Sequence, residues 1–182
     1  MVTILQKGIN GKKDKLKLII TKDGEFIPDI YDKLPGNCLW IEYKRQEIEN
    51  LIAKRSISSL DEEKISKCKD LCSSIEKQLR KNIILKLSLA RKSGQAISGF
   101  ENVKMAIKFD NVGILFHACD GSKKELGRIT NSSLKLPIVD LFNSEELGKV
   151  FNKDTTVHSC VLKCSLANSL ILDVKKLEGI QN

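Results

Sequence analysis

The segment Leu89–Val103, which reads LARKSGQAISGFENV, decides the fold class of this chain. It predicts the end of a helix, a turn at Gly94, a short strand over Gln95–Ser98 and a second helix that begins at Gly99. Strands and helices then alternate, which is typical of helices packed on both faces of a small sheet. We therefore predict an α/β fold, with a three-layer α/β/α sandwich on a small mixed sheet in the C-terminal half.

The rest of the C-terminal half continues this alternation. The apolar run Val112–Ala118 is nearly unbroken, as expected for a strand that is buried on both faces. The last expected helix carries apolar side chains along one face, which would cover the sheet. The expected elements are helices at Gly99–Phe109, Ser122–Ile129, Ser144–Val150 and Leu166–Leu177, and strands at Val112–Ala118, Pro137–Phe142 and Val157–Leu162.

The N-terminal half follows a different pattern. A charged segment with a thin apolar stripe is typical of a connecting helix, and a helix with a stronger apolar face is expected from Asn82 onward. We therefore predict a small α+β domain over 1–58, a connecting helix over 59–81 and a second domain over 82–182. The first domain is expected to contain three strands and one short amphipathic helix, at Leu16–Ile20, Glu25–Ile27, Cys38–Tyr43 and Glu47–Ile52.

The chain carries an excess of positive charge. Its 182 residues include 31 lysines and arginines against 23 acidic residues, which gives a net charge of +8. Such an excess favours a polyanionic partner, although a basic protein without one is the alternative. The sequence contains no apolar run long enough for a membrane span and no signal peptide. We therefore expect no membrane partner and a cytoplasmic location.

The cysteines and histidines do not predict a metal site or a catalytic centre. The pairs Cys68/Cys72 and Cys160/Cys164 have helical spacing, but no set of histidines accompanies them and Cys68/Cys72 lies in a predicted surface helix. We therefore expect free thiols and no metal or other cofactor. His117 lies in an expected buried strand and is interpreted as a core residue. No serine elbow or phosphate-loop signature is present, so we predict no enzyme activity.

Four ordered segments of the C-terminal half carry a family resemblance. They are Leu87–Gly94 with Ser98–Val103, Ile114–Asp120, Leu136–Val139 and Glu146–Lys153. Together they resemble the ribosomal-type kink-turn RNA-binding family, in its bacterial YlxQ-like branch, over residues 82–178. The resemblance implies a three-layer α/β/α sandwich that binds structured RNA, either ribosomal or another stable RNA.

A second resemblance covers residues 13–57. The matching pieces are Leu16–Ile20, Asp23-Gly24, Ile27–Asp29, Lys33–Gly36 and Trp40-Ile41. They look like the YlxR-like domain, which some bacteria fuse ahead of a kink-turn domain. The basic turn of that family is replaced here by Gly36–Leu39, and its usual Arg-Cys start is absent.

The first group of RNA contacts implied by the resemblance lies at the start of the helix after Gly99. Gly99 would allow the RNA to approach the backbone, and Glu101 and Asn102 would meet guanine edges, because a carboxylate accepts and an amide both donates and accepts. Met105 stands where the family usually has a lysine, and Lys108 is a nearby cation. The alternative is that Gly99 only caps the helix and that Glu101 is only an acidic residue of the first turn, where the helix dipole favours a negative charge.

The second implied group lies in a later loop and at the end of an earlier helix. Asn152 stands where the family prefers glycine, and asparagine tolerates a positive φ. The lysines would bind phosphates, unless the loop is only a solvated basic surface. The two cations of the earlier helix have the alternative role of complementing the helix dipole. The group comprises Gly148, Lys149, Asn152 and Lys153, together with Arg91 and Lys92.

Two functions follow from these observations. The first is a non-catalytic RNA-binding protein that recognises structured, kink-turn-like RNA, with ribosomal or RNA-processing proteins as further partners. RNA readers commonly use such non-helical features, because the major groove of A-form RNA is too narrow. The second is a protein-interaction adaptor, in which the charged helix over 60–80 and the N-terminal domain dock on a ribosomal or RNA-processing protein.

Overall fold

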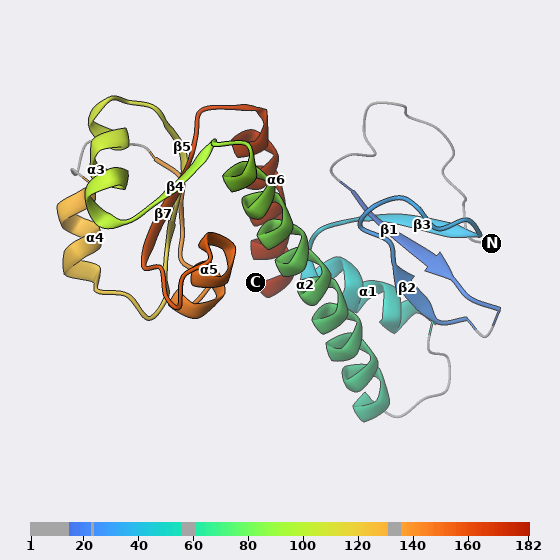
Figure 1. Ribbon diagram of the computed structural model, residues 1–182. Helices are drawn as coiled ribbons and strands as arrows, with labels where there is room; N and C mark the ends of the chain where they lie inside the picture. The colour runs from blue at the N-terminus through green and yellow to red at the C-terminus, as the bar shows by residue number, and fades with distance from the viewer. Residues whose placement is uncertain (1–14, 23, 56–60, 131–135) are drawn as a thin grey trace. The chain divides into compact units, whose positions relative to one another are not determined.

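The computed structural model describes residues 15–22, 24–55, 61–130 and 136–182 (Figure 1). Their contacts divide the chain into two compact units. The first unit comprises the described residues up to Arg80 together with Lys176–Asn182, and the second comprises Lys81–Lys175. The division falls inside two helices, α2 (Asp61–Lys92) and α6 (Ser165–Gln181).

The first unit is built on an antiparallel sheet of three strands in the order β2-β1-β3. The strands are β1 (Lys15–Ile20), β2 (Phe26–Pro28) and β3 (Cys38–Glu42), and helix α1 (Arg45–Arg55) follows them. Leu16, Leu18 and Ile48 are fully buried. The predicted strands and helix of this region are therefore present, with boundaries that differ by a few residues.

A buried lysine orders the loop that follows β2. Lys17 Nζ donates to Asp32 Oδ1 and to the Leu34 carbonyl oxygen, each at 2.7 Å, and lies 3.2 Å from Asp29 Oδ2. The Asp29 carboxylate also accepts the backbone N–H groups of Lys33 and Leu34. These bonds satisfy a charge that would be costly to bury alone.

Residues Lys176–Asn182 belong to the first unit, and the last turns of α6 lie close to Tyr43, the residue after β3. A Cβ atom on Gly179 would overlap the carbonyl oxygen of Tyr43. Lys176 Nζ lies 5.0 Å from the centroid of the Tyr43 ring. Only a glycine permits this backbone approach.

Helix α2 corrects two predictions made from the sequence. The segment 59–81 and the helix expected from Asn82 are not separate, because α2 runs unbroken for 32 residues. Cys68 and Cys72 are buried and do not lie on the surface. The physical reason is that no glycine or proline interrupts the segment and the apolar spacing continues across it. Its fully or nearly fully buried positions are Cys72, Ile75, Leu79, Ile83, Leu87 and Ala90.

The second unit contains a mixed sheet of four strands in the order β4-β7-β5-β6. The strands are β4 (Ala96–Ser98), β5 (Val112–His117), β6 (Ile138–Val139) and β7 (His158–Leu162). Strand β7 is antiparallel to both neighbours, and β5 and β6 are parallel. The predicted mixed sheet is confirmed, although β6 is shorter than the expected strand Pro137–Phe142.

Helices cover the sheet on both sides (Figure 1). Helices α3 (Phe100–Lys108) and α4 (Lys123–Ile129) lie on one side, and α6 lies with the last turns of α2 on the other. Helix α5 (Ser144–Phe151) connects β6 to β7. The α/β fold class predicted from the sequence is confirmed.

Strand β5 forms the centre of the core. Leu115 packs with Val103 and Ile107 of α3, whereas Ile114 and Phe116 face the opposite side of the sheet and are fully buried. A Cβ atom on Gly113 would lie 2.7 Å from Ala167 Cβ, so this glycine permits α6 to pack closely on the sheet. The nearly unbroken apolar run therefore forms a strand that is buried on both faces.

Candidate nucleic-acid interface

Helix α3 begins at a glycine whose backbone conformation other residues rarely adopt. Gly99 has φ 102° and ψ 147°. Its N–H donates to the His158 carbonyl oxygen at 2.9 Å, and its carbonyl oxygen accepts from the Val103 N–H at 3.0 Å. The atom nearest to an added Cβ would be Asn102 Nδ2, at 3.8 Å. The requirement for glycine is therefore conformational and not steric.

The first turn of α3 presents polar groups to the surface. Glu101 and Asn102 are exposed, and Asn102 Nδ2 donates to the Ser98 carbonyl oxygen at 3.2 Å. Because Gly99 has no side chain, no side-chain cap covers the N–H groups of this turn. Uncapped N–H groups at a helix start attract anions.

The loop after α5 folds back on the last turn of that helix. Asn152 adopts the left-handed conformation, with φ 55° and ψ 44°, and its N–H donates to the Gly148 carbonyl oxygen. The Lys153 N–H donates to the same oxygen at 3.0 Å. A Cβ atom on Gly148 would lie 2.6 Å from the Asp154 carbonyl oxygen, so glycine is required there. Asparagine thus takes the role that the sequence predicted for it.

Side-chain hydrogen bonds connect this loop to two other segments. Arg91 Nη1, at the end of α2, donates to the Val150 carbonyl oxygen at 2.7 Å and to Asn152 Oδ1 at 2.8 Å. Lys153 Nζ donates to Ser98 Oγ at 3.1 Å. Three segments that are distant in the sequence therefore meet at one place. We call this group the Ser98 junction, and it comprises Arg91, Ser98, Gly99, Asn102, Asn152 and Lys153.

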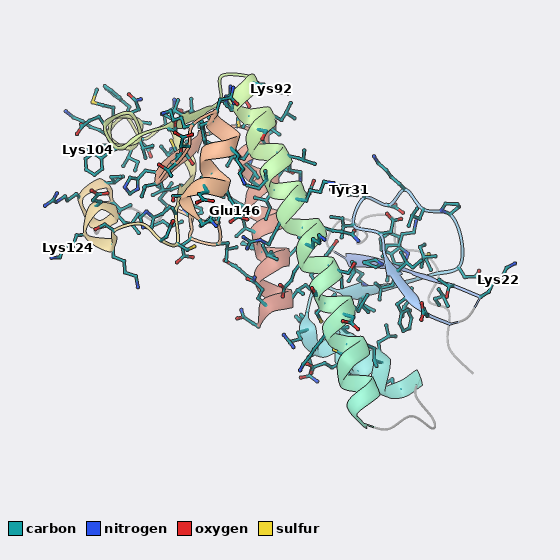
Figure 2. The ribbon with its side chains drawn as sticks, turned by 60° about the horizontal axis from the view of Figure 1, so that its bottom comes forward. Lys22, Tyr31, Lys92, Lys104, Lys124 and Glu146 are labelled. Carbon is teal, nitrogen blue, oxygen red and sulfur yellow. The ribbon has the colours of Figure 1, made fainter. Side chains whose placement is uncertain are left out.

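Of the other residues predicted for the site, Gly148 accepts two backbone N–H groups of the junction through its carbonyl oxygen, and the remaining five carry exposed side chains. Lys92 and Lys149 are exposed, and so are Glu101 and Lys108. The Met105 side chain is 50% exposed. Figure 2 shows Lys92 at the end of α2 and Lys104 on α3, both on the outside of the second unit. Lys104 Nζ lies 5.7 Å from the Phe100 ring centroid, where a cation is attracted to the ring.

Two residues of this region were not predicted from the sequence. Ser98 was interpreted only as the end of a strand, yet it accepts from both Asn102 and Lys153. His158 was not assigned to the site, yet its carbonyl oxygen accepts the Gly99 N–H. A polar residue directly before a glycine that starts a helix is the one local signal that points to Ser98.

The two histidines form a buried pair beneath the Ser98 junction. Their rings stack with centroids 5.0 Å apart, and their Nδ1 atoms are 3.2 Å apart. His158 Nε2 lies 3.4 Å from Glu125 Oε2. Burial, followed by the adjacent His158, lowers the pKa of His117, against opposing effects of the Gly121 backbone, Asp140 and Glu125. His117 is 4% exposed, which confirms its interpretation as a core residue.

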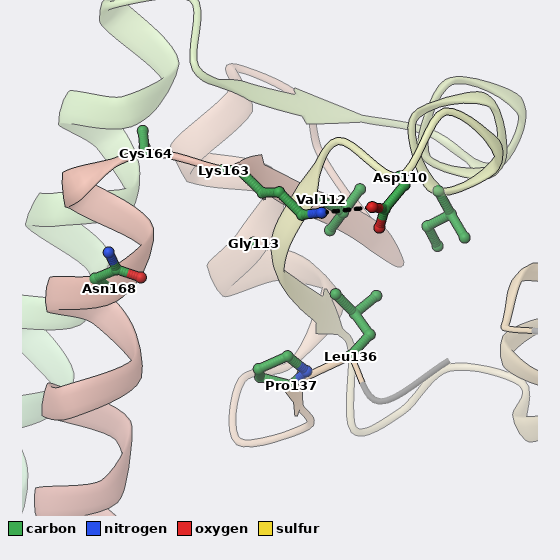
Figure 3. A pocket seen from close by; sticks show the side chains of 9 residues that line it. Asp110, Val112, Gly113, Leu136, Pro137, Lys163, Cys164 and Asn168 are labelled. Atoms are coloured by element: carbon green, nitrogen blue, oxygen red, sulfur yellow. Dashed lines mark ion pairs between the residues drawn. The ribbon is translucent and has the colours of Figure 1, made fainter. Parts of the chain in front are cut away.

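A pocket of about 540 Å³ lies at the opposite end of the sheet (Figure 3). The strand register establishes this, because β5 and β7 pair from Val112/Leu162 at the pocket to His117/His158 at the junction. Lys163 Nζ and Asp110 Oδ2 form an ion pair of 2.8 Å at the pocket. The pocket is also lined by Ile107, Val112, Gly113, Leu136, Pro137, Cys164 and Asn168. None of the residues that line the pocket was predicted from the sequence to contact RNA.

The described residues form neither a metal-binding cluster nor a membrane-spanning helix. No group of three or more His, Cys, Asp or Glu side chains within 15–22, 24–55, 61–130 and 136–182 is arranged to hold a metal ion. None of the helices in these ranges combines the length and the apolar character that crossing a membrane requires.

Comparison with solved structures gives a partial structural likeness. A solved structure of a protein with unknown function from Bacillus halodurans is 23% identical to this chain, with a TM-score of 0.46. The match covers 51% of this chain and 96% of that one. No protein-family model matches the chain, and no curated protein is significantly similar to it.

Proposed function

We propose that this protein is a non-catalytic, cytoplasmic RNA-binding protein whose second unit holds structured, kink-turn-like RNA at the Ser98 junction. The observation that carries the proposal is the bond of 3.1 Å between Lys153 Nζ and Ser98 Oγ. It ties the loop after α5 to the start of α3, and these are the two segments to which the family resemblance assigns RNA contacts. A surface organised before binding loses less conformational entropy when the RNA arrives.

The start of α3 would read the bases. A kink-turn bends sharply and exposes the edges of its sheared G·A pairs, which an A-form helix would hide. Gly99 lets the RNA come close to the backbone, and the uncapped N–H groups of the first turn favour a phosphate. The Glu101 carboxylate can accept from guanine N–H groups, and the Asn102 amide can donate or accept.

The surrounding cations would hold the phosphates. Lys92 and Lys149 are exposed next to the segments that form the Ser98 junction, and Lys104 and Lys108 follow along α3. Met105 supplies no charge, so one phosphate contact of the resembled family is lost and the neighbouring lysines replace it. Each phosphate neutralised releases counterions, so binding weakens as salt increases.

Filter binding tests the proposal directly. The probe is a short RNA with a kink-turn, and the control is the same RNA with its G·A pairs replaced by Watson–Crick pairs. Both are measured at about 50 and 200 mM salt, where a protein with several phosphate contacts loses affinity steeply. We expect the kink-turn RNA to bind more tightly at both concentrations. Equal affinity for the two RNAs would reject recognition of the kink.

Exposed apolar side chains of the first unit favour the adaptor as a second candidate function. Ile27 and Tyr31 are each 44% exposed, and Leu34 is 43% exposed. The buried Lys17 orders the loop that carries two of them. A pull-down after nuclease treatment separates the candidates: ribosomal or RNA-processing proteins retained without RNA favour the adaptor, and their loss favours RNA binding.

A further inference from the structure

The hydrogen-bond partners of His117 and His158 select one tautomer for each ring. Glu125 Oε2 is a carboxylate oxygen, so His158 Nε2 has to carry a proton to donate to it across 3.4 Å. In the neutral ring, His158 Nδ1 is then an acceptor, and His117 Nδ1 donates to it across 3.2 Å. This leaves His117 Nε2 as a bare acceptor, and that atom is buried without a hydrogen-bond partner.

The pair is connected directly to the start of α3. The His158 carbonyl oxygen accepts the Gly99 N–H, and the edge of its ring meets Phe100, with centroids 5.8 Å apart. Ser159 pairs with Ser98 across β7 and β4. His158 therefore contacts the Gly99 backbone and the Phe100 ring at the start of α3, and it also contacts Glu125 of α4.

An added proton meets one favourable backbone partner, Gly121, which acts to raise the pKa of His117 but is outweighed by burial and by His158. His117 Nε2 is the vacant position, but it is buried, and a charge there would be poorly solvated. The ring packs closely on Gly121, where a Cβ atom would lie only 2.8 Å from His117 Cε1. A proton on His158 Nδ1 would instead break the bond between the rings. Either change disturbs His158 and hence the Gly99 backbone.

The charged groups around the pair are acidic, and they only partly offset this cost. Glu125 of α4 and Asp140 after β6 act to raise the pKa of His117. The charge of His117 in turn acts to lower the pKa of Asp120, which follows β5. Burial and the adjacent ring outweigh them, so His117 resists protonation. The folded unit therefore loses stability as the pH falls below 6.5, the ordinary histidine value, because the unfolded chain then binds more protons.

We propose that the His117–His158 pair positions the start of α3, and that RNA binding at the Ser98 junction weakens when the pair takes up a proton. The second part rests on the proposed function, whereas the first does not. The expected direction distinguishes the pair from general electrostatics. Acidification makes a basic protein more positive, which by itself would strengthen the binding of RNA.

The first experiment needs no RNA. Two-dimensional NMR follows the Gly99 amide and the imidazole resonances of the full chain as the pH is lowered from about 8 until the imidazole resonances have titrated. We expect the Gly99 resonance to move with the same midpoint as the imidazole resonances. A Gly99 amide that stays unchanged while an imidazole titrates would overturn the proposal.

The second experiment measures affinity for the kink-turn RNA at about pH 7.5 and at the lower pH at which the imidazole resonances have titrated, both at constant ionic strength. We expect at least about a fivefold loss at the lower pH, the lower end of ordinary coupling between sites. Unchanged or stronger binding would overturn the coupling to RNA. If the kink-turn and control RNAs bind equally at the higher pH, the proposed function fails, and the Gly99 titration still decides the positioning role.

Two variants separate positioning from simple packing. His117→Asn keeps an amide donor near the position of Nδ1 and removes the vacant nitrogen, so the loss of affinity over this pH range should disappear. Glu125→Gln changes a side chain that is 48% exposed, so the protein should still fold. Because Glu125 favours the protonated pair, removing its charge should move the Gly99 midpoint to lower pH. A midpoint that stays the same or rises in Glu125→Gln would contradict the proposal.

Discussion

Arg91 and Asn152 lie 61 positions apart in the chain, yet Arg91 Nη1 donates to Asn152 Oδ1 across 2.8 Å. The same nitrogen donates to the Val150 carbonyl oxygen. Arg91 thus holds both the last turn of α5 and the left-handed residue that ends it. A residue predicted either to bind phosphate or to complement the helix dipole also fixes the loop that carries Lys153.

The double role of Arg91 predicts a difference between two adjacent cations. Arg91→Ala should lower the free energy of unfolding by about 1–2 kcal/mol, because two hydrogen bonds from a charged group are lost. The control Lys92→Ala removes the same charge from an exposed position and should change stability by less than about 0.5 kcal/mol. Urea denaturation measures both. Equal stability of the two variants would show that the Arg91 bonds do not hold the loop.

Substitution by alanine should have opposite effects on stability at Gly99 and at Gly127. Gly99→Ala should destabilise the protein by about 1–3 kcal/mol, since alanine is strained at φ 102°. Gly127→Ala, in α4, meets no atom within 4 Å and should stabilise the helix by about 0.5–1 kcal/mol. Thermal unfolding of both variants checks the prediction, which a stable Gly99→Ala protein would refute.

The polar pair on the first turn of α3 predicts a loss of RNA specificity. Glu101→Ala combined with Asn102→Ala should weaken binding to the kink-turn RNA by about 1–3 kcal/mol, the contribution of a good base contact. The control combines Asn168→Ala, at the pocket, with Glu178→Ala, which makes the same change in net charge. Filter binding compares the two double variants. An unchanged binding curve would exclude Glu101 and Asn102 from the interface.

The buried Lys17 predicts a sensitive point in the first unit. Lys17→Met should lower the free energy of unfolding by about 1–3 kcal/mol, because the Asp29 carboxylate and the Leu34 carbonyl oxygen lose a charged donor. Lys15→Met, on the exposed end of the same strand, is the control and should have little effect. Chemical denaturation followed by the single tryptophan, Trp40 of β3, measures both variants.

The same network predicts how this unit responds to acid. Burial acts to raise the pKa of Asp29, but hydrogen bonds from Leu34, Lys33 and Lys17 outweigh it and lower the pKa below its ordinary 3.8. The stability contributed by Asp29 is therefore present above that value and is lost as the pH falls through the lower folded pKa. In an acid titration, Lys17→Met should lose less stability over this range than the unsubstituted protein. An identical loss of stability in the two proteins would argue against the network.

The environments of the cysteines predict two classes of thiol reactivity. Burial raises the pKa of Cys160 to about 12, and burial with the neighbouring Cys68 does the same for Cys72. Cys38 and Cys119 are exposed. A thiol reagent at mildly alkaline pH should modify the exposed pair quickly and Cys72 and Cys160 only after unfolding. Rapid modification of Cys160 in the native protein would contradict its burial.

Local sequence patterns were sufficient to place most elements of the fold. The apolar run Val112–Ala118 became β5 (Val112–His117), and the spacing in Leu166–Leu177 became part of α6. Such patterns work because a strand or helix with one apolar face has to bury it. The two helices expected on either side of residue 82 are one helix, α2, because a change in surface charge does not end a helix whose apolar spacing continues.

The sequence by itself determined the strands and helices, the need for a glycine at the start of α3 and the turn at Asn152, since these depend on neighbours along the chain. Only the tertiary structure decided that Lys153 meets Ser98, 55 positions away, and that His117 meets His158, 41 positions away. Both contacts depend on the strand order β4-β7-β5-β6, which brings the end of β4, the start of β7 and the end of β5 together. The order of strands is selected by packing of the whole core, and no local pattern encodes it.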